Sequence, residues 1–231
     1  MTDTTGTPVD TTVRGHFITF EGGEGAGKST QITHLAKRLA GRAIATCVTR
    51  EPGGTPFAEY ARAVLLDPVT APQSPLAQAV LFYAARADHL DQVIRPALSA
   101  GTWVLCDRFA DSTRAYQGAA GGVPPETLAV LDQAVVGPTQ PELTLLLDLE
   151  PRIGLMRANQ RRATSTSGTF IAADTYESRQ LAFHERLRVG FLAIAKAEPD
   201  RVVVLDAFQN ELTIADQIWR AVCTRFALDD R

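Results

Sequence analysis

The chain has 231 residues, of which 45% are hydrophobic and 21% charged, and its formal net charge at pH 7 is −3. This length suits one α/β domain with insertions better than two full domains, and the hydrophobic content is enough for a substantial core. The mildly negative charge gives no general case for a nucleic-acid or anionic-membrane partner, although a nucleotide substrate needs only a local cluster of positive groups.

The first residues and the cysteines indicate the cellular compartment of the protein. Residues 1–13 are rich in threonine and lack an apolar run, so we expect a disordered tail there rather than a targeting segment, followed by one domain over 14–231. No apolar stretch reaches the roughly 18 residues that a membrane-spanning helix needs. Cys47, Cys106 and Cys223 are odd in number and lack zinc spacing, which favours free thiols in a reducing compartment. We therefore expect a cytoplasmic protein.

Strand-like and helical segments alternate along the chain. Short apolar runs predict strands, whereas apolar residues three and four positions apart predict helices. Residues 159–173 show neither pattern, and a mobile loop is expected there. In chain order the predicted elements are a strand over 16–20, a helix over 30–39, a strand over 43–48, helices over 57–66 and 76–98 (with a kink or restart at Pro96), a strand over 102–106, helices over 112–118 and 124–135, a strand over 143–148, a helix from 151, a helix over 174–197, a strand over 201–205 and a helix over 212–226. This alternation predicts an α/β fold with a five-stranded, mostly parallel sheet flanked by helices.

The turn after the first predicted strand carries the most specific motif. Gly22, Gly27, Lys28 and Ser29 complete the pattern G-x-x-x-x-G-K-[ST] of a phosphate-binding P-loop. Lys28 would reach the β- and γ-phosphates of a nucleotide, and the Ser29 hydroxyl would ligate Mg²⁺. Backbone N–H groups would surround the phosphate chain along the whole loop, at Gly22, Gly23, Glu24, Gly25, Ala26, Gly27, Lys28, Ser29 and Thr30.

Two classes of P-loop protein compete for this motif. A nucleotide-dependent switch that binds guanine would carry D-x-x-G after the P-loop and N-K-x-D further on, but the one D-x-x-G, residues 3–6, precedes the P-loop and no Asn-Lys pair occurs. A phosphotransferase needs a second anion site, because phosphoryl transfer is mainly positioning and charge neutralisation. Arginines do fall at predicted strand ends and in the predicted loop, at Arg50, Arg86, Arg108, Arg161 and Arg162. The pattern favours the phosphotransferase.

Four further stretches make the interpretation specific. They are Thr-Arg-Glu-Pro-Gly-Gly-Thr at 49–55, Leu-Phe-Tyr-Ala-Ala-Arg at 81–86, Gly-Thr-Trp-Val-Leu-Cys-Asp-Arg at 101–108 and Ser-Thr-Arg-Ala-Tyr-Gln-Gly at 112–118. Together with the P-loop, and in this order, they resemble the bacterial thymidylate kinases, a family of nucleoside-monophosphate kinases. The resemblance implies a three-layer P-loop NTPase fold with a lid at about 157–175. It also implies ATP and Mg²⁺ as cofactors, dTMP as the acceptor, and a homodimer without nucleic-acid or membrane partners.

The resemblance assigns the acceptor site residue by residue. It implies that Glu24 accepts a hydrogen bond from the deoxyribose 3′-OH, although an acid at a helix N-terminus is also favoured by the helix dipole. Arg50 and Arg108 would clamp the acceptor phosphate, because a guanidinium binds phosphate oxygens in a bidentate manner. Phe82 would stack on thymine, with an ordinary core aromatic as the alternative. The remaining roles are a hydrogen bond from Arg86 to the pyrimidine O4, contacts to base and sugar from Thr113 and Gln117, and exclusion of a 2′-OH by Tyr116. The alternative for Tyr116 is a packing tyrosine with a satisfied hydroxyl.

Catalysis is expected to need an arginine from the lid. Some relatives carry that arginine inside the P-loop, but this chain has Gly25 at the position, and so Arg161 or Arg162 is expected to supply the charge. Asp107 would hold Mg²⁺ through water or orient Arg108, and Lys28 and Arg108 would neutralise the transferred phosphoryl group. One departure is that Asp174-Thr175-Tyr176-Glu177 stands where relatives often have Asp-Arg-x-Glu. Another nucleoside-monophosphate or deoxynucleoside kinase remains the alternative enzyme.

Overall fold

The computed structural model describes residues 14–67, 73–164, 176 and 179–229, without the side chains of Arg162 and Thr164. The predicted tail at 1–13 and residues 165–175 of the predicted lid therefore lie outside the described residues.

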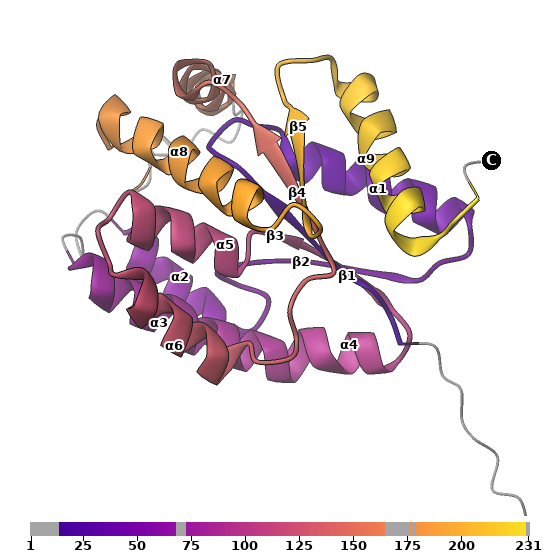
Figure 1. Ribbon diagram of the computed structural model, residues 1–231, viewed down its shortest axis with the longest axis horizontal. Helices are drawn as coiled ribbons and strands as arrows, with labels where there is room; N and C mark the ends of the chain where they lie inside the picture. Colours follow the sequence, from indigo (N-terminus) through magenta and orange to yellow (C-terminus); the bar gives the residue numbers. More distant parts are fainter. Residues whose placement is uncertain (1–13, 68–72, 165–175, 177–178, 230–231) are drawn as a thin grey trace, which may run out of the picture.

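One sheet of five parallel strands forms the centre of the described chain (Figure 1). The strands stand in the order β2-β3-β1-β4-β5, and each neighbouring pair is parallel. Their bounds are β1 Phe17–Glu21, β2 Thr46–Arg50, β3 Trp103–Asp107, β4 Leu143–Asp148 and β5 Val202–Asp206. Because all five run the same way, their carboxyl ends meet at one edge, where ligands bind in sheets of this kind. The predicted parallel α/β fold is confirmed.

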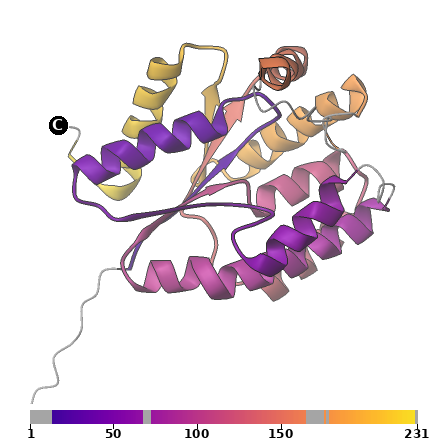
Figure 2. The same cartoon turned by 180° about the vertical axis from the view of Figure 1, so that it is seen from behind.

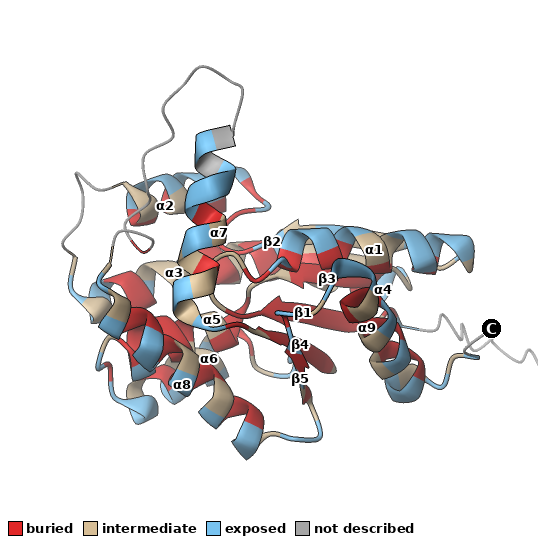
Figure 3. Ribbon diagram, turned by 90° about the horizontal axis from the view of Figure 1, so that it is seen from above, coloured by how far each residue is buried: buried red, intermediate tan, exposed pale blue. Residues whose placement is uncertain are grey.

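Helices cover both faces of the sheet, as side chains on the strands alternate between two apolar clusters. Ile18 and Phe20 of β1 point toward α1 and α9, which lie together on one face (Figure 2), whereas Phe17 points to the opposite face. The three central strands are almost entirely buried between these layers (Figure 3). The helices are α1 Lys28–Gly41, α2 Pro56–Leu66, α3 Pro75–His89, α4 Arg95–Ser99, α5 Ala110–Thr113, α6 Pro125–Val135, α7 Pro151–Thr164, α8 Leu181–Ala197 and α9 Glu211–Phe226, with π-helical segments at Leu90–Ile94 and Arg114–Ala119.

Two predicted helix boundaries near the predicted lid were wrong. Helix α7 continues to Thr164, although residues 159–164 were predicted to be loop, because arginine, glutamine and alanine favour a helix without forming an apolar stripe. Helix α8 begins at Leu181 rather than at 174, and Gln180 before it is extended.

The second strand was predicted over 43–48 but lies at 46–50. Ala43 has a left-handed φ of 56°, which does not fit an extended strand.

The long helix predicted over 76–98 is continuous but not regular. Helix α3 passes into the π-helical segment Leu90–Ile94 and then into α4, where Pro96 occupies the first turn. Proline has no N–H to donate to the preceding turn, and it follows directly on the segment where the hydrogen bonding changes to i→i+5, with the Arg95 N–H bound to the Leu90 carbonyl. Within the described part of the chain no helix is long and apolar enough to cross a bilayer. Cys47, Cys106 and Cys223 are free thiols, as expected.

Candidate active site

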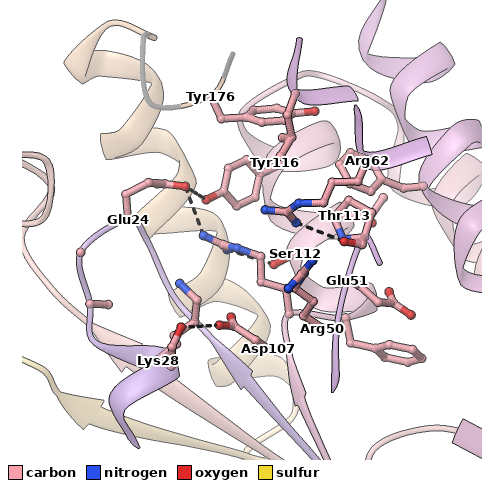
Figure 4. Close-up of a pocket in the computed structure, with 18 of the residues that line it drawn as sticks. Glu24, Lys28, Arg50, Glu51, Arg62, Asp107, Ser112, Thr113, Tyr116 and Tyr176 are labelled. Atoms are coloured by element: carbon pink, nitrogen blue, oxygen red, sulfur yellow. Dashed lines mark hydrogen bonds and ion pairs between the residues drawn. The ribbon is translucent and has the colours of Figure 1, made fainter. Parts of the chain in front are cut away.

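A cavity of about 280 Å³ lies at the carboxyl ends of β1, β2 and β3 (Figure 4). It contains most of the site residues that the sequence predicted: Glu24, Gly25, Ala26, Gly27, Lys28, Ser29, Thr30, Arg50, Phe82, Arg86, Asp107, Arg108, Thr113, Tyr116, Gln117 and Arg161. Gly22 and Gly23 line a small adjoining cavity behind the P-loop instead. The side chain of Arg162 is outside the described atoms. Chain segments far apart in sequence therefore meet as the motifs suggested.

The P-loop has the backbone that its glycines permit. Gly22, Gly25 and Gly27 have positive φ angles of 133°, 69° and 90°, which residues with a Cβ rarely adopt. Helix α1 then starts at Lys28 with no side-chain cap on its first N–H groups, so these groups remain available to an anion. The loop is therefore shaped for a phosphate chain.

Lys28 folds back over this loop. Its Nζ donates to the carbonyl oxygens of Gly22 and Gly23, at 3.2 and 3.0 Å. Burial, together with the positive charge of Arg108, lowers the pKa of Lys28 to about 8, against the opposing effect of nearby carboxylates. A phosphate group entering the loop would compensate this buried ammonium.

The oxygen atoms of Ser29 and Asp107 stand together beside the P-loop. The Ser29 hydroxyl donates to Asp107 Oδ2 at 2.9 Å, joining the first turn of α1 to the end of β3. A hydroxyl and a carboxylate are hard oxygen ligands of the kind that Mg²⁺ takes alongside substrate phosphates. These two residues fit the predicted metal role.

Arg108 reaches across the cavity to the P-loop. Its Nη1 donates to the Gly22 carbonyl at 3.0 Å and to Ser112 at 3.2 Å, and its Nη2 donates to Glu24 Oε1 at 3.1 Å. Burial would lower the pKa of Arg108, but Tyr116 and Glu24 raise it above its usual value. The backbone φ of Arg108 is 69°, a conformation that is costly for a residue with a side chain and is concentrated at functional sites.

Glu24 is the centre of a compact polar group (Figure 4). Tyr116 donates its hydroxyl to Glu24 Oε1 at 2.5 Å, and His184 Nδ1 lies 3.5 Å from Oε2. Burial would raise the pKa of Glu24, but His184, Arg108 and Lys28 hold it well below its usual range. Tyr116 is thus a packing tyrosine with a satisfied hydroxyl, as one of its two predicted roles has it, and the exclusion of a 2′-OH stays a prediction.

A buried carboxylate that the sequence reasoning missed supports the loop after β3. Glu21 Oε1 accepts from the backbone N–H of Phe109 at 2.8 Å, and Oε2 accepts from the Ser112 hydroxyl at 2.6 Å. Burial and the charge of Asp111 raise the pKa of Glu21 to about 7. The signal available in the sequence was the position of Glu21, an acidic residue at the end of a largely apolar strand.

Arg50 and Arg62 face the cavity from the β2–α2 region. Arg50 Nη2 donates to both carboxylate oxygens of Glu59 at 3.0 and 3.1 Å and remains 55% exposed. Arg62, which was not predicted, donates to the Pro52 carbonyl at 3.1 Å. The other cavity residues that were not predicted are Glu51, Pro52, Leu66, Phe109, Ser112 and Tyr176.

The far end of the cavity is lined by aromatic and amide side chains. Phe82 is half-buried, and its ring centroid lies 6.4 Å from that of Tyr176. Gln117 Nε2 donates to the Tyr176 hydroxyl at 3.0 Å, and this hydroxyl donates to Gln78 at 3.1 Å. Arg86 is buried and donates to Glu51 and Thr113. This end combines a flat apolar surface with fixed polar groups.

The arginines of helix α7 have different surroundings. Arg161 lines the cavity, whereas Arg157 donates to the Ala207 carbonyl at 3.1 Å and so connects α7 to the segment after β5. Of the unusual tetrapeptide at 174–177, Tyr176 alone belongs to the described residues, and the consequence of Thr175 is outside them.

Comparison with known proteins agrees with this arrangement. A family model described as thymidylate kinase matches residues 20–218. The chain belongs to the thymidylate kinase family. Among curated thymidylate kinases, that of Caulobacter vibrioides is 54% identical over 84% of this chain and 89% of its own length, and that of Afipia carboxidovorans is 50% identical over 93% and 91%. A crystal structure of thymidylate kinase from Ehrlichia chaffeensis is 29% identical, has a TM-score of 0.70, and covers 90% of this chain and 98% of its own.

Proposed function

We propose that the protein transfers the γ-phosphoryl group of ATP to dTMP, giving ADP and dTDP, a precursor of dTTP. The observation that carries this function is that the P-loop and Arg108 line the same cavity as Phe82 and Arg86. A nucleotide-binding module would need the P-loop alone. Arg108, Phe82 and Arg86 supply what a nucleotide acceptor needs, which is a phosphate contact, a stacking surface and a polar contact to the base.

The donor side consists of the P-loop and its neighbours. The backbone from Gly22 to Thr30 binds the phosphate chain of ATP, and Lys28 carries the positive charge for the β- and γ-phosphates. Ser29 and Asp107 hold Mg²⁺, which neutralises phosphate charge when bound. Their separation of 2.9 Å supports this assignment.

The acceptor side consists of the arginines and aromatics. Arg108 and Arg50 bind the acceptor phosphate, Glu24 accepts from the sugar 3′-OH, and Tyr116 excludes a 2′-OH. Phe82 stacks on thymine, Arg86 donates to the pyrimidine O4, and Thr113 and Gln117 contact the base and sugar. The acceptor phosphate is already anionic, so no general base is required, and Arg161 or Arg162 stabilises the charge that develops during transfer.

An ADP-release assay with MgATP and a panel of dTMP, dUMP, dCMP, AMP and GMP tests the function. We expect the highest kcat/KM with dTMP. Better turnover with AMP or GMP would favour another nucleoside-monophosphate kinase. Tight nucleotide binding without acceptor-dependent turnover would favour a switch.

We further propose a homodimer that forms through α2 and α3. These two helices pack together and expose a set of large apolar side chains with few charges among them: Phe57, Tyr60, Val64, Leu76 and Val80. Exposed apolar patches of this kind mark interaction sites. Sedimentation should give a dimer for the wild type and a monomer for Tyr60→Arg/Val80→Asp.

We also propose that residues 14–231 form one domain with a lid at about 157–175. The free thiols favour the cytoplasm as the location of the protein.

A further inference from the structure

A chain of four polar side chains runs behind the base end of the cavity. The Thr49 hydroxyl lies 2.7 Å from His89 Nε2, and His89 Nδ1 lies 3.0 Å from Glu51 Oε1. The other oxygen of this carboxylate, Oε2, accepts from Arg86 Nε at 2.7 Å. His89 is fully buried and Arg86 is 1% exposed, so water does not compete for these bonds. The chain therefore links β2 to the C-terminal turn of α3 through side chains alone.

The direction of each hydrogen bond follows from the chemistry of the groups. An ionised carboxylate can only accept, so His89 carries a proton on Nδ1 and donates it to Glu51. With its proton at Nδ1, a neutral imidazole accepts at Nε2, where the Thr49 hydroxyl is placed to donate. Glu51 thus receives one donor on each oxygen, His89 on Oε1 and Arg86 on Oε2.

Arg86 is held in one orientation by these contacts. Nε is bound to Glu51, Nη2 donates to Thr113 at 3.0 Å, and the guanidinium lies 4.6 Å from the ring centroid of Tyr83 and 5.1 Å from that of Phe109. Nη1 is buried and has no hydrogen-bond partner among the residues that the structure describes. Arg86 lines the cavity, and so one fixed donor remains for a ligand.

The turn after β2 is shaped around the imidazole. Gly54 has a φ of +87°, and a Cβ at this position would lie 2.6 Å from His89 Nε2 and 2.8 Å from Thr49 Oγ1. The backbone therefore approaches the histidine as closely as a residue without a side chain allows. A ring enclosed in this way cannot change its rotamer without displacing the turn.

We propose that His89 is a positioning residue for recognition of the acceptor base, an inference that rests on the proposed function. It does not line the cavity and acts through Glu51, which it holds in the orientation that fixes Arg86. A fixed Nη1 donor favours a base with a carbonyl oxygen at the facing position, as in thymine. It opposes cytosine, whose amino group at that position is also a donor.

Three substitutions separate the links of this chain. His89→Leu removes both ring nitrogens at similar size, and His89→Asn keeps an N–H donor near the position of Nδ1. Thr49→Val removes the outer hydroxyl alone. His34→Asn is the matched control, because His34 is on α1, paired with Glu211 and not part of the cavity lining. For each variant, kcat and KM are measured with dTMP, with dCMP and with ATP.

For His89→Leu we expect KM for dTMP to rise about 10- to 100-fold, which corresponds to leaving one buried polar group unpaired. The ratio of kcat/KM for dTMP to that for dCMP falls by a similar factor, while kcat and KM for ATP change less than about threefold. His89→Asn recovers most of the loss, and Thr49→Val gives a smaller change in the same direction. Substitution of a merely structural histidine would instead lower the melting temperature and would lower kcat/KM for dTMP, dCMP and ATP by similar factors.

The outcomes distinguish this inference from the function on which it rests. A wild-type protein that does not turn over dTMP contradicts the proposed function itself. If the wild type is active, an unchanged dTMP-to-dCMP ratio of kcat/KM in His89→Leu overturns the role of His89. A rise in KM for ATP as large as the rise in KM for dTMP overturns it as well. If His89→Leu does not fold, Thr49→Val decides: an unchanged ratio in a folded Thr49→Val protein overturns the inference, and a reduced ratio supports it.

Discussion

Gly25 of the P-loop and Gly154 of α7 make a backbone contact that leaves no space for a side chain on either residue. A Cβ at Gly25 would lie 2.2 Å from the Gly154 carbonyl oxygen, and a Cβ at Gly154 would lie 2.3 Å from the carbonyl oxygen of Glu24. An arginine at position 25 is therefore excluded as long as α7 keeps this place. The contact supports the proposal that the catalytic arginine comes from α7, and it ties that helix to the phosphate-binding loop.

Gly154→Ala tests this contact. Alanine is the better helix former by about 1 kcal/mol, so any loss of stability must come from the clash. We expect the free energy of unfolding in urea to fall by about 1–3 kcal/mol, as in other overpacked sites, and kcat to fall as α7 moves away. In the control Gly41→Ala, at the end of α1, a Cβ meets nothing within 4 Å and stability should not decrease. An equal effect of the two substitutions on the free energy of unfolding and on kcat would contradict a restrictive contact at Gly154.

Arg108→Ala should abolish transfer while largely sparing ATP binding. The guanidinium contacts Glu24 and Gly22 and stands between the two proposed phosphate sites, and arginines that stabilise a transferring phosphoryl group are worth about 10³–10⁵ in rate. The measurement is kcat with dTMP beside calorimetric titration with ATP. The exposed Arg38→Ala, on α1 and paired with Asp216, is the control. Unchanged turnover in Arg108→Ala would place it outside the reaction.

The features that the sequence could predict are those formed by residues close together in the chain. The P-loop, the segment 49–55 that contains Arg50 and the turn of α3 that carries Phe82 and Arg86 are short motifs whose spacing is visible in the chain. Each of them contributes residues to one cavity. The sheet was predictable for a similar reason, because buried strands are continuous apolar runs. Each of these features is decided within a few residues.

What the sequence could not predict depends on contacts between distant segments. His184 lies beside Glu24 although 160 positions separate them, and nothing near His184 marks it as part of a phosphate site. The close approach of Gly154 is likewise invisible, since a lone glycine in a helix has many explanations. The end of α7 was missed for a different reason: its residues are helix formers by intrinsic preference, and periodicity detects only helices with an apolar face.

Arg161 and Arg162 should affect the rate of transfer more than the affinity for dTMP. Arg161 lines the same cavity from α7. We expect Arg161→Ala/Arg162→Ala to lower kcat about 10³-fold or more with less than a tenfold change in KM for dTMP. The single variants then show which arginine acts. Arg152→Ala, exposed on the same helix, is the control. An unchanged kcat in the double variant would contradict the role of the lid arginines.

The titration of Lys28 should make ATP affinity and protein stability change in opposite directions above neutral pH. With its pKa lowered to about 8 by burial, Lys28 in the free protein loses its proton above that pH, and ATP binding must then restore it. The Kd for MgATP should therefore rise, by up to tenfold per pH unit, between pH 8 and 9.5.

The free energy of unfolding increases with pH over the same range. The reason is that the unfolded chain, whose lysine keeps a pKa near 10.5, binds more protons there than the folded protein. The contribution of Lys28 to the free energy of unfolding accordingly increases as the pH rises from about 8 toward 10.5. Lys28→Met should bind ATP weakly with little dependence on pH, and should lose this contribution to stability. Calorimetric titration and urea unfolding of both proteins at pH 7, 8, 9 and 9.5 measure the two effects. A wild-type Kd that is constant from pH 7 to 9.5 would contradict a lysine with a lowered pKa in the P-loop.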